Sequence, residues 1–173
     1  MKLDVRFTIK RATLDDLDLL VTQRHKMFQE IRRRNARDLK EIDSLYRKWL
    51  RDMLSKRRIV CFLAIDQFGK TAGGGCVWIR DVPPSPWTGL RLRAPYLMSM
   101  YTEPRYRGLG IASAIVRSAM VWSKKMGYNR ITLHASEAGR PVYRRLGWTR
   151  TWEMRAELGR SMSSRLVRIR ANA

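Results

Sequence analysis

A strand-like segment runs into a glycine-rich turn near the middle of the chain. Met98–Thr102 is mostly apolar, and Pro104 ends the strand pattern because proline has no N–H to donate. Gly108 and Gly110 then precede a segment with helical periodicity. The first N–H groups of a helix have no internal partners, and glycines let a ligand approach the backbone closely. The spacing predicts an anion site suited to a diphosphate, with Arg107 as a cation at its rim.

A dinucleotide-binding βαβ unit is the main competitor for such a turn. That unit requires a third glycine, which would fall at position 113, where this chain has Ser113. It also requires an acidic residue at the end of a strand about 20 residues later, and Ile131–Ala135 has none. Both departures argue against a dinucleotide site.

The turn resembles the signature of the GNAT N-acyltransferase superfamily, which reads Gln or Arg, two residues, Gly, one residue, then Gly or Ala. Arg107–Ala112 agrees with it in full. The resemblance implies acetyl-coenzyme A (acetyl-CoA) as acyl donor, with its diphosphate on the backbone amides of the turn and its pantetheine arm along the preceding strand end. The cofactor-binding residues implied in this way are Met100, Tyr101, Thr102, Arg107, Gly108, Leu109, Gly110, Ile111, Ala112 and Ser136.

A second segment, Gly139–Trp148, resembles the family's terminal Tyr-x-x-x-Gly-aromatic element. By this resemblance Tyr143 protonates the leaving thiolate. Seven residues before that tyrosine the family often carries an Asn that hydrogen-bonds the cofactor, whereas this chain has the shorter Ser136. The order of segments agrees with the family over about residues 5–158.

The activity implied is N-acetyl transfer from acetyl-CoA to a primary amine by direct attack on the thioester. A lysine-like amine has a pKa of about 10.4, so only about 1 in 2,500 is neutral at pH 7 and a base is useful. Tyr96–Thr102 contains no glutamate, which leaves the base open. Glu153 is the leading candidate and Glu103 the next, while His134 is interpreted as a strand histidine.

The charge balance is strongly basic, with 36 Lys and Arg against 15 Asp and Glu and a net charge of +21. Such a field attracts polyanions. The net charge therefore leaves two alternative functions open beside that of an enzyme acting on an amine-bearing small molecule or peptide. One is a nucleic-acid- or ribosome-associated binding module on the same scaffold, and the other is a protein N-terminal or lysine acetyltransferase. The oligomeric state stays open between monomer and homodimer.

The length of 173 residues predicts one domain, residues 1–158, followed by a basic tail, residues 159–173. No apolar run approaches the roughly 20 residues of a membrane helix, and Met1–Arg6 lacks the apolar stretch of an export signal. We therefore expect a cytoplasmic protein without membrane association, in which Cys61 and Cys76 are buried thiols. No cluster has metal-ligand spacing, so no metal is expected.

Hydrophobic periodicity predicts a layered α/β domain. With the resemblance, the expected fold is the GNAT-type acyl-CoA N-acyltransferase fold, a mixed, mostly antiparallel twisted sheet flanked by helices. The expected strands are Val5–Ile9, Ile59–Ile65, Thr71–Ile79, Tyr96–Thr102, Ile131–Ala135 and Trp148–Leu158. Helices are expected after a capping box at Thr13 and over Leu39–Met53, Gly108–Lys125 and Pro141–Leu146.

Overall fold

A five-stranded mixed sheet organises the protein, in the order β1-β2-β3-β4-β5. The structure is a computed structural model that describes residues 6–32, 36–86 and 88–154. Neighbours from β1 to β4 pair antiparallel, and β5 runs parallel to β4. The strands are β1 (Phe7–Arg11), β2 (Ile59–Asp66), β3 (Thr71–Asp81), β4 (Arg93–Thr102) and β5 (Thr132–Leu133). The helices are α1 (Leu17–Arg32), α2 (Ala36–Ser55), α3 (Ile111–Lys125) and α4 (Arg140–Arg145).

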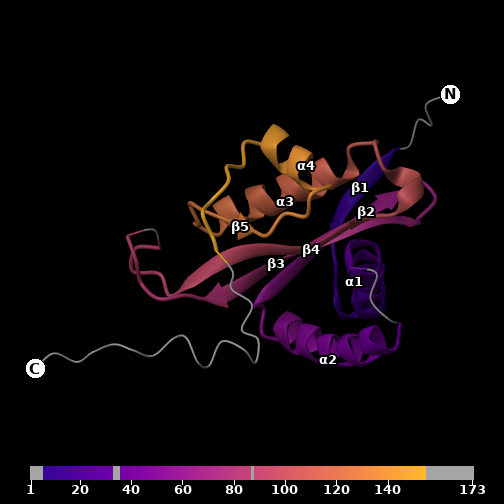
Figure 1. Cartoon of the computed structure of the whole chain (residues 1–173), viewed down its shortest axis with the longest axis horizontal. Coiled ribbons are helices and arrows are strands. Elements are labelled where there is room, and N and C mark those ends of the chain that lie inside the picture. Colours follow the sequence, from indigo (N-terminus) through magenta and orange to yellow (C-terminus); the bar gives the residue numbers. More distant parts are fainter. Residues whose placement is uncertain (1–5, 33–35, 87, 155–173) are drawn as a thin grey trace, which may run out of the picture.

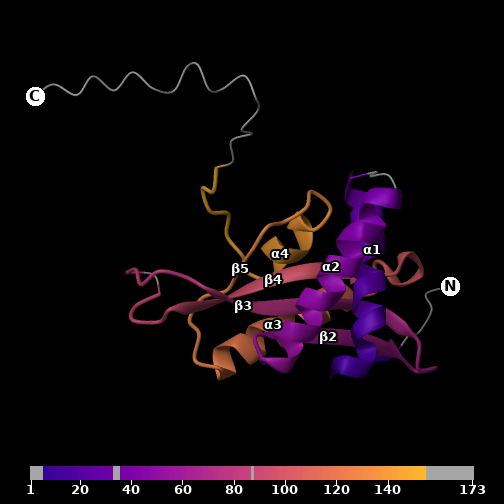
Figure 2. The same cartoon turned by 90° about the horizontal axis from the view of Figure 1, so that it is seen from below.

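Helices cover both faces of the sheet, which confirms the expected layered fold. Figure 1 shows α3 and α4 on one face and α1 and α2 on the other, and Figure 2 shows α1 and α2 crossing the sheet. Phe62 and Val77 pack with Ile115 of α3 in one core, while Leu63 packs with Leu50 of α2 in the other. Because successive strand side chains point to opposite faces, β2 and β3 serve both cores, which explains their almost wholly apolar sequences.

The first helix begins as its sequence predicts. Thr13 Oγ1 accepts a hydrogen bond from the Asp15 N–H, and the Asp16 carboxylate accepts one from the Thr13 N–H at 2.9 Å. This capping box satisfies N–H groups that a helix start leaves without partners. A short 3₁₀ turn, Leu14–Asp16, then leads into α1.

The strands β2 and β3 form a hairpin, and an aspartate closes its turn. Asp66 Oδ1 accepts hydrogen bonds from the N–H groups of Phe68 and Lys70 at 2.9 and 2.8 Å. Cys61 and Cys76 face each other across these strands as free, buried thiols, as expected.

A β-bulge interrupts the pairing of β3 with β4. Gly74 stands opposite Tyr101 and Cys76 opposite Met98, so Ser99 and Met100 share the single position opposite Gly75. Ser99 takes a positive φ of 54°, a conformation that costs a non-glycine residue roughly 1–2 kcal/mol. A side chain at Gly75 would collide with the sulfur of Met100, which accounts for the glycine at the bulge.

The predicted strand Trp148–Leu158 is wrong over its described part, because residues 148–154 form neither strand nor helix and 155–158 lie outside the described residues. Trp148 turns inward and donates from Nε1 to Met120 Sδ, while Trp152 and Met154 are 88% and 94% exposed. The segment has strand-like residue types, but its side chains are not buried against a sheet edge.

Other boundaries shift. Phe7–Arg11 replaces the predicted Val5–Ile9, with Val5 outside the described residues, and Thr132–Leu133 replaces the longer Ile131–Ala135. The helix predicted from Gly108 begins at Ile111, because the glycines before it have left-handed backbone angles that end helical geometry. The predicted domain end at residue 158 and the basic tail lie outside the described residues.

Candidate functional site

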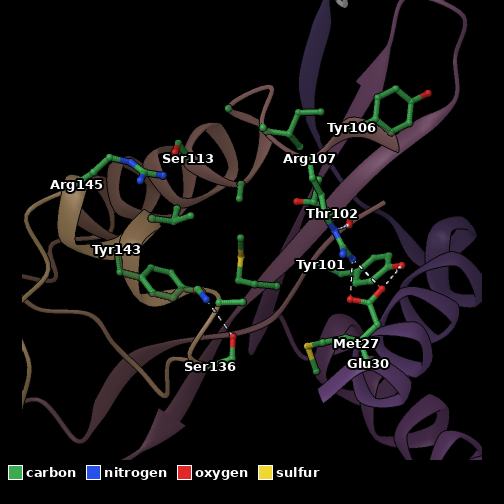
Figure 3. Close-up of a pocket in the computed structure, with 18 of the residues that line it drawn as sticks. Met27, Glu30, Tyr101, Thr102, Tyr106, Arg107, Ser113, Ser136, Tyr143 and Arg145 are labelled. Atoms are coloured by element: carbon green, nitrogen blue, oxygen red, sulfur yellow. Dashed lines mark hydrogen bonds and ion pairs between the residues drawn. The ribbon is translucent and has the colours of Figure 1, made fainter. Parts of the chain in front are cut away.

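A cavity of about 570 Å³ opens between α1, the end of β4, the start of α3 and α4. Figure 3 shows its two walls, with Glu30, Tyr101 and Arg107 on one side and Tyr143 and Ser136 on the other. Its lining is Met27, Glu30, Ile31, Met100, Tyr101, Thr102, Tyr106, Arg107, Gly108, Gly110, Ile111, Ala112, Ser113, Ser136, Ala138, Gly139, Val142, Tyr143 and Arg145. The volume lies within the range of small-molecule and cofactor sites.

The glycine turn forms one end of the cavity. Gly108 and Gly110 have φ angles of 78° and 81°, which other residues rarely adopt. A side chain at either position would meet no atom within 4 Å, so the backbone conformation, and not crowding, requires glycine. Gly110 is the N-cap of α3 and makes no side-chain cap, which leaves the first N–H groups of a 15-residue helix for a ligand.

Arg107 differs from its expected role. Its Nη2 lies 2.7 Å from both carboxylate oxygens of Glu30, and its Nε donates to the Thr102 carbonyl at 3.1 Å. The guanidinium therefore reaches back to α1 and is already paired. The Tyr101 hydroxyl also donates to Glu30, at 3.3 Å, and burial, followed by the charges of Glu103 and Glu30, raises the pKa of Tyr101.

Tyr143 lies on α4 at the other end of the cavity. Burial, with a smaller contribution from Tyr96, raises the Tyr143 pKa to about 12. Its ring packs on the Trp148 ring at 5.7 Å between centroids, and α4 stops just before Gly147. The phenol is therefore held in its protonated form at neutral pH, as a hydrogen-bond donor should be.

Ser136 lines the cavity, but its hydroxyl has a structural partner. Its Oγ accepts a hydrogen bond from the Gly139 N–H at 3.2 Å, which shapes the turn into α4. The Gly139 carbonyl in turn accepts a hydrogen bond from the Tyr143 N–H, four residues later. Ser136 therefore supports the position of Tyr143.

The sheet opens beside the cavity. β4 and β5 pair only at Tyr96–Thr132 and Leu97–Leu133. Past these pairs Met100 and Ser136 both line the cavity. A slot therefore separates the two segments of the chain at the place where a longer β5 would have closed the sheet. This slot follows from the short β5 that the sequence did not predict.

Neither of the two residues expected to act as base belongs to the cavity lining. Glu103 pairs with Lys26 of α1 at 2.7 Å. Glu153 pairs with Nε2 of His134 at 2.7 Å and does not belong to the cavity lining. Of the ten residues expected to bind the cofactor, nine line the cavity, and the exception is Leu109, whose side chain packs on the core under α3.

The sequence did not mark as site residues the members of α1 that line the cavity. Met27, Glu30 and Ile31 line the cavity, although their spacing is that of an ordinary amphipathic helix. No local signal marks them, because only the packing of α1 against β4 brings them to the turn. Tyr96 was likewise read only as a strand residue.

Two classes of feature are not found in the described ranges. No group of three or more His, Cys, Asp or Glu residues there could hold a metal ion. None of the helices described combines the length and apolar character that crossing a membrane requires.

Comparison with known proteins decides the family. Residues 25–148 match the family model described as the acetyltransferase (GNAT) family, which is most of the chain. The chain is a GNAT acetyltransferase. The match spans the glycine turn, the slot between β4 and β5, and Tyr143. Every residue that lines the cavity lies within the matched range.

Solved structures resemble this GNAT acetyltransferase over nearly their whole lengths. A GCN5-related N-acetyltransferase from Ralstonia eutropha JMP134 is 28% identical with a TM-score of 0.81, and 88% of this chain and 99% of that one are covered. A predicted acetyltransferase from Clostridium acetobutylicum, solved with acetyl-CoA, is 28% identical with a TM-score of 0.78, covering 89% and 96%.

More distant neighbours show the fold alone. A ribosomal-protein-alanine N-acetyltransferase from Brucella melitensis biovar Abortus 2308 is 20% identical with a TM-score of 0.65, covering 89% of this chain and 99% of that one. Comparison with curated proteins gives no significant match.

Proposed function

We propose that this GNAT acetyltransferase transfers the acetyl group of acetyl-CoA to a primary amine by direct attack on the thioester. The proposal rests on one observation: a cavity of about 570 Å³ runs from the glycine turn at one end to Tyr143 at the other. An anion site at one end and a phenol at the other suit a donor with a diphosphate at one end and a thioester at the other.

The glycine turn is the proposed diphosphate site. N–H groups from Gly108 to Ala112 would hold its oxygens, and the positive end of the α3 dipole favours negative charge there. Met100, Tyr101 and Thr102 would pair their backbone with the pantetheine arm in the slot beside β5. Leu109 contributes at most its backbone, since its side chain packs on the core.

The reaction makes a C–N bond and breaks a C–S bond. The amine lone pair attacks the carbonyl carbon, a backbone N–H near the Ser99–Met100 bulge stabilises the charge that develops on the carbonyl oxygen, and the thiolate leaves. The bulge supports this role because it removes that stretch of β4 from regular pairing with β3.

Tyr143 is proposed to assist the leaving thiolate. Free thiols have a pKa near 8.5, so complete transfer of a proton from a phenol of pKa about 12 would be uphill by roughly 5 kcal/mol at 1.36 kcal/mol per unit. The larger contribution of Tyr143 is therefore a hydrogen bond donated to sulfur as the C–S bond breaks. As the amide forms, the nitrogen loses one proton, and the thiolate takes up one proton from solvent to become the free thiol of CoA.

The experiment is a thiol-release assay with acetyl-CoA against a panel of small amines, lysine-containing peptides and peptides with free N-termini, with products identified by mass spectrometry. Calorimetry with CoA, on the same folded material, measures donor binding separately. Acetylation of an amine, with CoA binding, supports the proposal. Folded protein that takes up no CoA contradicts it.

A further inference from the structure

A phenol, an imidazole and a carboxylate form a chain of contacts where β4 and β5 separate. The Tyr96 hydroxyl is hydrogen-bonded to Nδ1 of His134, and Nε2 of His134 lies 2.7 Å from Oε2 of Glu153. The Tyr96 and His134 rings lie 5.6 Å apart between centroids. The three residues come from β4, the segment just past β5, and the segment after α4, so only the tertiary structure brings them together.

Tyr96, His134 and Glu153 lie beside the cavity, outside its lining. Tyr96 belongs to the last pairs of β4 with β5, while Ser136, two residues past His134, lines the cavity. The Tyr96 phenol is also close enough to Tyr143 to raise the pKa of Tyr143. His134 has a side chain that is 61% exposed, so the imidazole can exchange protons with solvent.

We propose that Tyr96, His134 and Glu153 form the proton relay that deprotonates the attacking amine, an inference that rests on the proposed function. The ammonium form of the acceptor gives one proton to the Tyr96 oxygen while the Tyr96 hydroxyl proton moves to Nδ1 of His134. The amine keeps its lone pair for the C–N bond, and the imidazolium returns the proton to solvent.

His134, the middle residue of the three, is the proton acceptor because the Tyr96 phenol is poorly suited to that role. Burial raises the pKa of Tyr96, against smaller lowering effects of a hydrogen bond to His134 and of the Arg80 charge, and the charge of Glu153 adds to the rise. Tyr96 therefore stays protonated and can only pass a proton on. Arg80 of β3 holds its guanidinium 4.6 Å from the centre of the Tyr96 ring. A neutral imidazole offers a lone pair near neutral pH.

Glu153 is a positioning residue in this proposal. When His134 Nε2–H donates to the carboxylate, Nδ1 is left without a proton and can accept from Tyr96. The carboxylate also stabilises the imidazolium that forms, without taking the proton itself. The residue that the sequence suggested as the base thus acts through His134.

The kinetic test compares His134→Gln, Tyr96→Phe and Glu153→Gln with His25→Gln. His25 is the matched control because it also pairs with a carboxylate, Asp43 at 2.5 Å, between α1 and α2. With an amine acetylated in the panel, we expect His134→Gln and Tyr96→Phe to lower kcat/KM about 100-fold and Glu153→Gln about tenfold. CoA affinity should stay within twofold in all four.

Chemical rescue separates proton transfer from a structural role. Imidazole added to His134→Ala should raise the yield of acetylated amine, measured by mass spectrometry so that acetylimidazole is not counted, at least fivefold. It should leave His25→Ala unchanged. A His134→Gln enzyme within threefold of His25→Gln, or a His134→Ala enzyme that imidazole does not rescue, overturns the relay.

A second measurement needs no acceptor. The chain has two histidines, so ¹⁵N NMR of the imidazoles assigns His134 by elimination with His25→Gln. We expect neutral His134 to carry its proton on Nε2 and Glu153→Gln to shift that tautomer balance. Arg80 and Tyr143 interact with Tyr96, the other partner of His134. A neutral imidazole protonated mainly on Nδ1 overturns the relay. Folded protein that takes up no CoA contradicts the proposed function, whereas an imidazole protonated mainly on Nδ1 overturns the relay and leaves the proposed function standing.

Discussion

Glu30 and Arg107 are joined by an ion pair in which one nitrogen, Nη2 of Arg107, lies 2.7 Å from each carboxylate oxygen. The pair ties α1 to the turn before α3 across 77 positions of sequence. It also places a carboxylate in the wall of the cavity, beside the proposed diphosphate site. The pair therefore links α1 to the proposed diphosphate site (Figure 3).

Glu30→Gln should strengthen CoA binding about threefold to tenfold, because it removes a negative charge beside the turn and frees the Arg107 guanidinium. Both side chains are nearly half exposed, so the free energy of unfolding should change by less than about 1 kcal/mol. Asp18→Asn is the control, since Asp18 lies on the same helix as Glu30 and pairs with Arg47 of α2. Calorimetry with CoA decides, and weaker binding by Glu30→Gln would show that the ion pair itself orders the site.

Gly110→Ala should weaken CoA binding at least tenfold. The left-handed φ of 81° disfavours alanine by roughly 1–2 kcal/mol, and relaxation toward negative φ would turn the N–H groups of the turn away from the cavity. Gly69→Ala is matched, because Gly69 has a φ of 76° and equally open space but lies in the β2–β3 turn. Thermal unfolding should show similar losses of stability for both variants. Equal CoA affinities would argue against a role for the turn.

Tyr143→Phe should lower kcat about tenfold to 100-fold and leave CoA affinity within twofold. Tyr143 acts while protonated, and its pKa is raised to about 12, so its contribution should persist through pH 10 and disappear as pH rises through 12. Tyr128→Phe serves as control because Tyr128 packs against Arg91 away from the cavity lining. A Tyr143→Phe enzyme at full rate would remove the assignment.

Asp66→Asn should lower the free energy of unfolding at pH 7, with a loss that shrinks in acid. The Tyr106 hydroxyl, 2.5 Å from Oδ2, is the main cause of a lowered Asp66 pKa, followed by the backbone N–H groups of the hairpin turn. A lowered pKa in the folded state gives stability that is present above the unfolded pKa of about 3.9 and lost as pH falls through the folded value. Urea unfolding at pH 7 and pH 3 measures this.

The control for that series is Asp52→Asn, in an exposed pair with Lys56 one helical turn away. It should change stability little at either pH. Asp66 also matters for the site, because Tyr106 directly precedes Arg107 and lines the cavity. An equal loss for Asp66→Asn at pH 7 and pH 3 would contradict the predicted pH dependence.

Local chemistry was predictable where a short segment contains its own cause. The Thr13 capping box, the Asp66 turn and the left-handed glycines at 108 and 110 each depend on atoms a few residues apart. The same holds for Tyr143, which a four-residue spacing ties to Gly147 at the end of α4. Such features can be read from sequence because their partners are neighbours in the chain.

The failed strand after α4 shows the opposite case. Residues 148–154 have aromatic and apolar types that favour a strand, but a strand also needs a partner edge and a face to bury. Two exposed side chains, Trp152 and Met154, show that neither is supplied in the described part. Residue type alone could not reveal this.

By itself the sequence determined the glycine turn, the position of the phenol and the order of the elements from β1 to α4, since each depends on backbone preferences and spacing within one segment. Only the tertiary structure decided that Arg107 pairs with Glu30, that β4 and β5 part after two residue pairs, and that Tyr96 meets His134 and Glu153. Those contacts join residues between 19 and 77 positions apart, or strands whose register no local pattern specifies, so they exist only once packing has set the distance between elements.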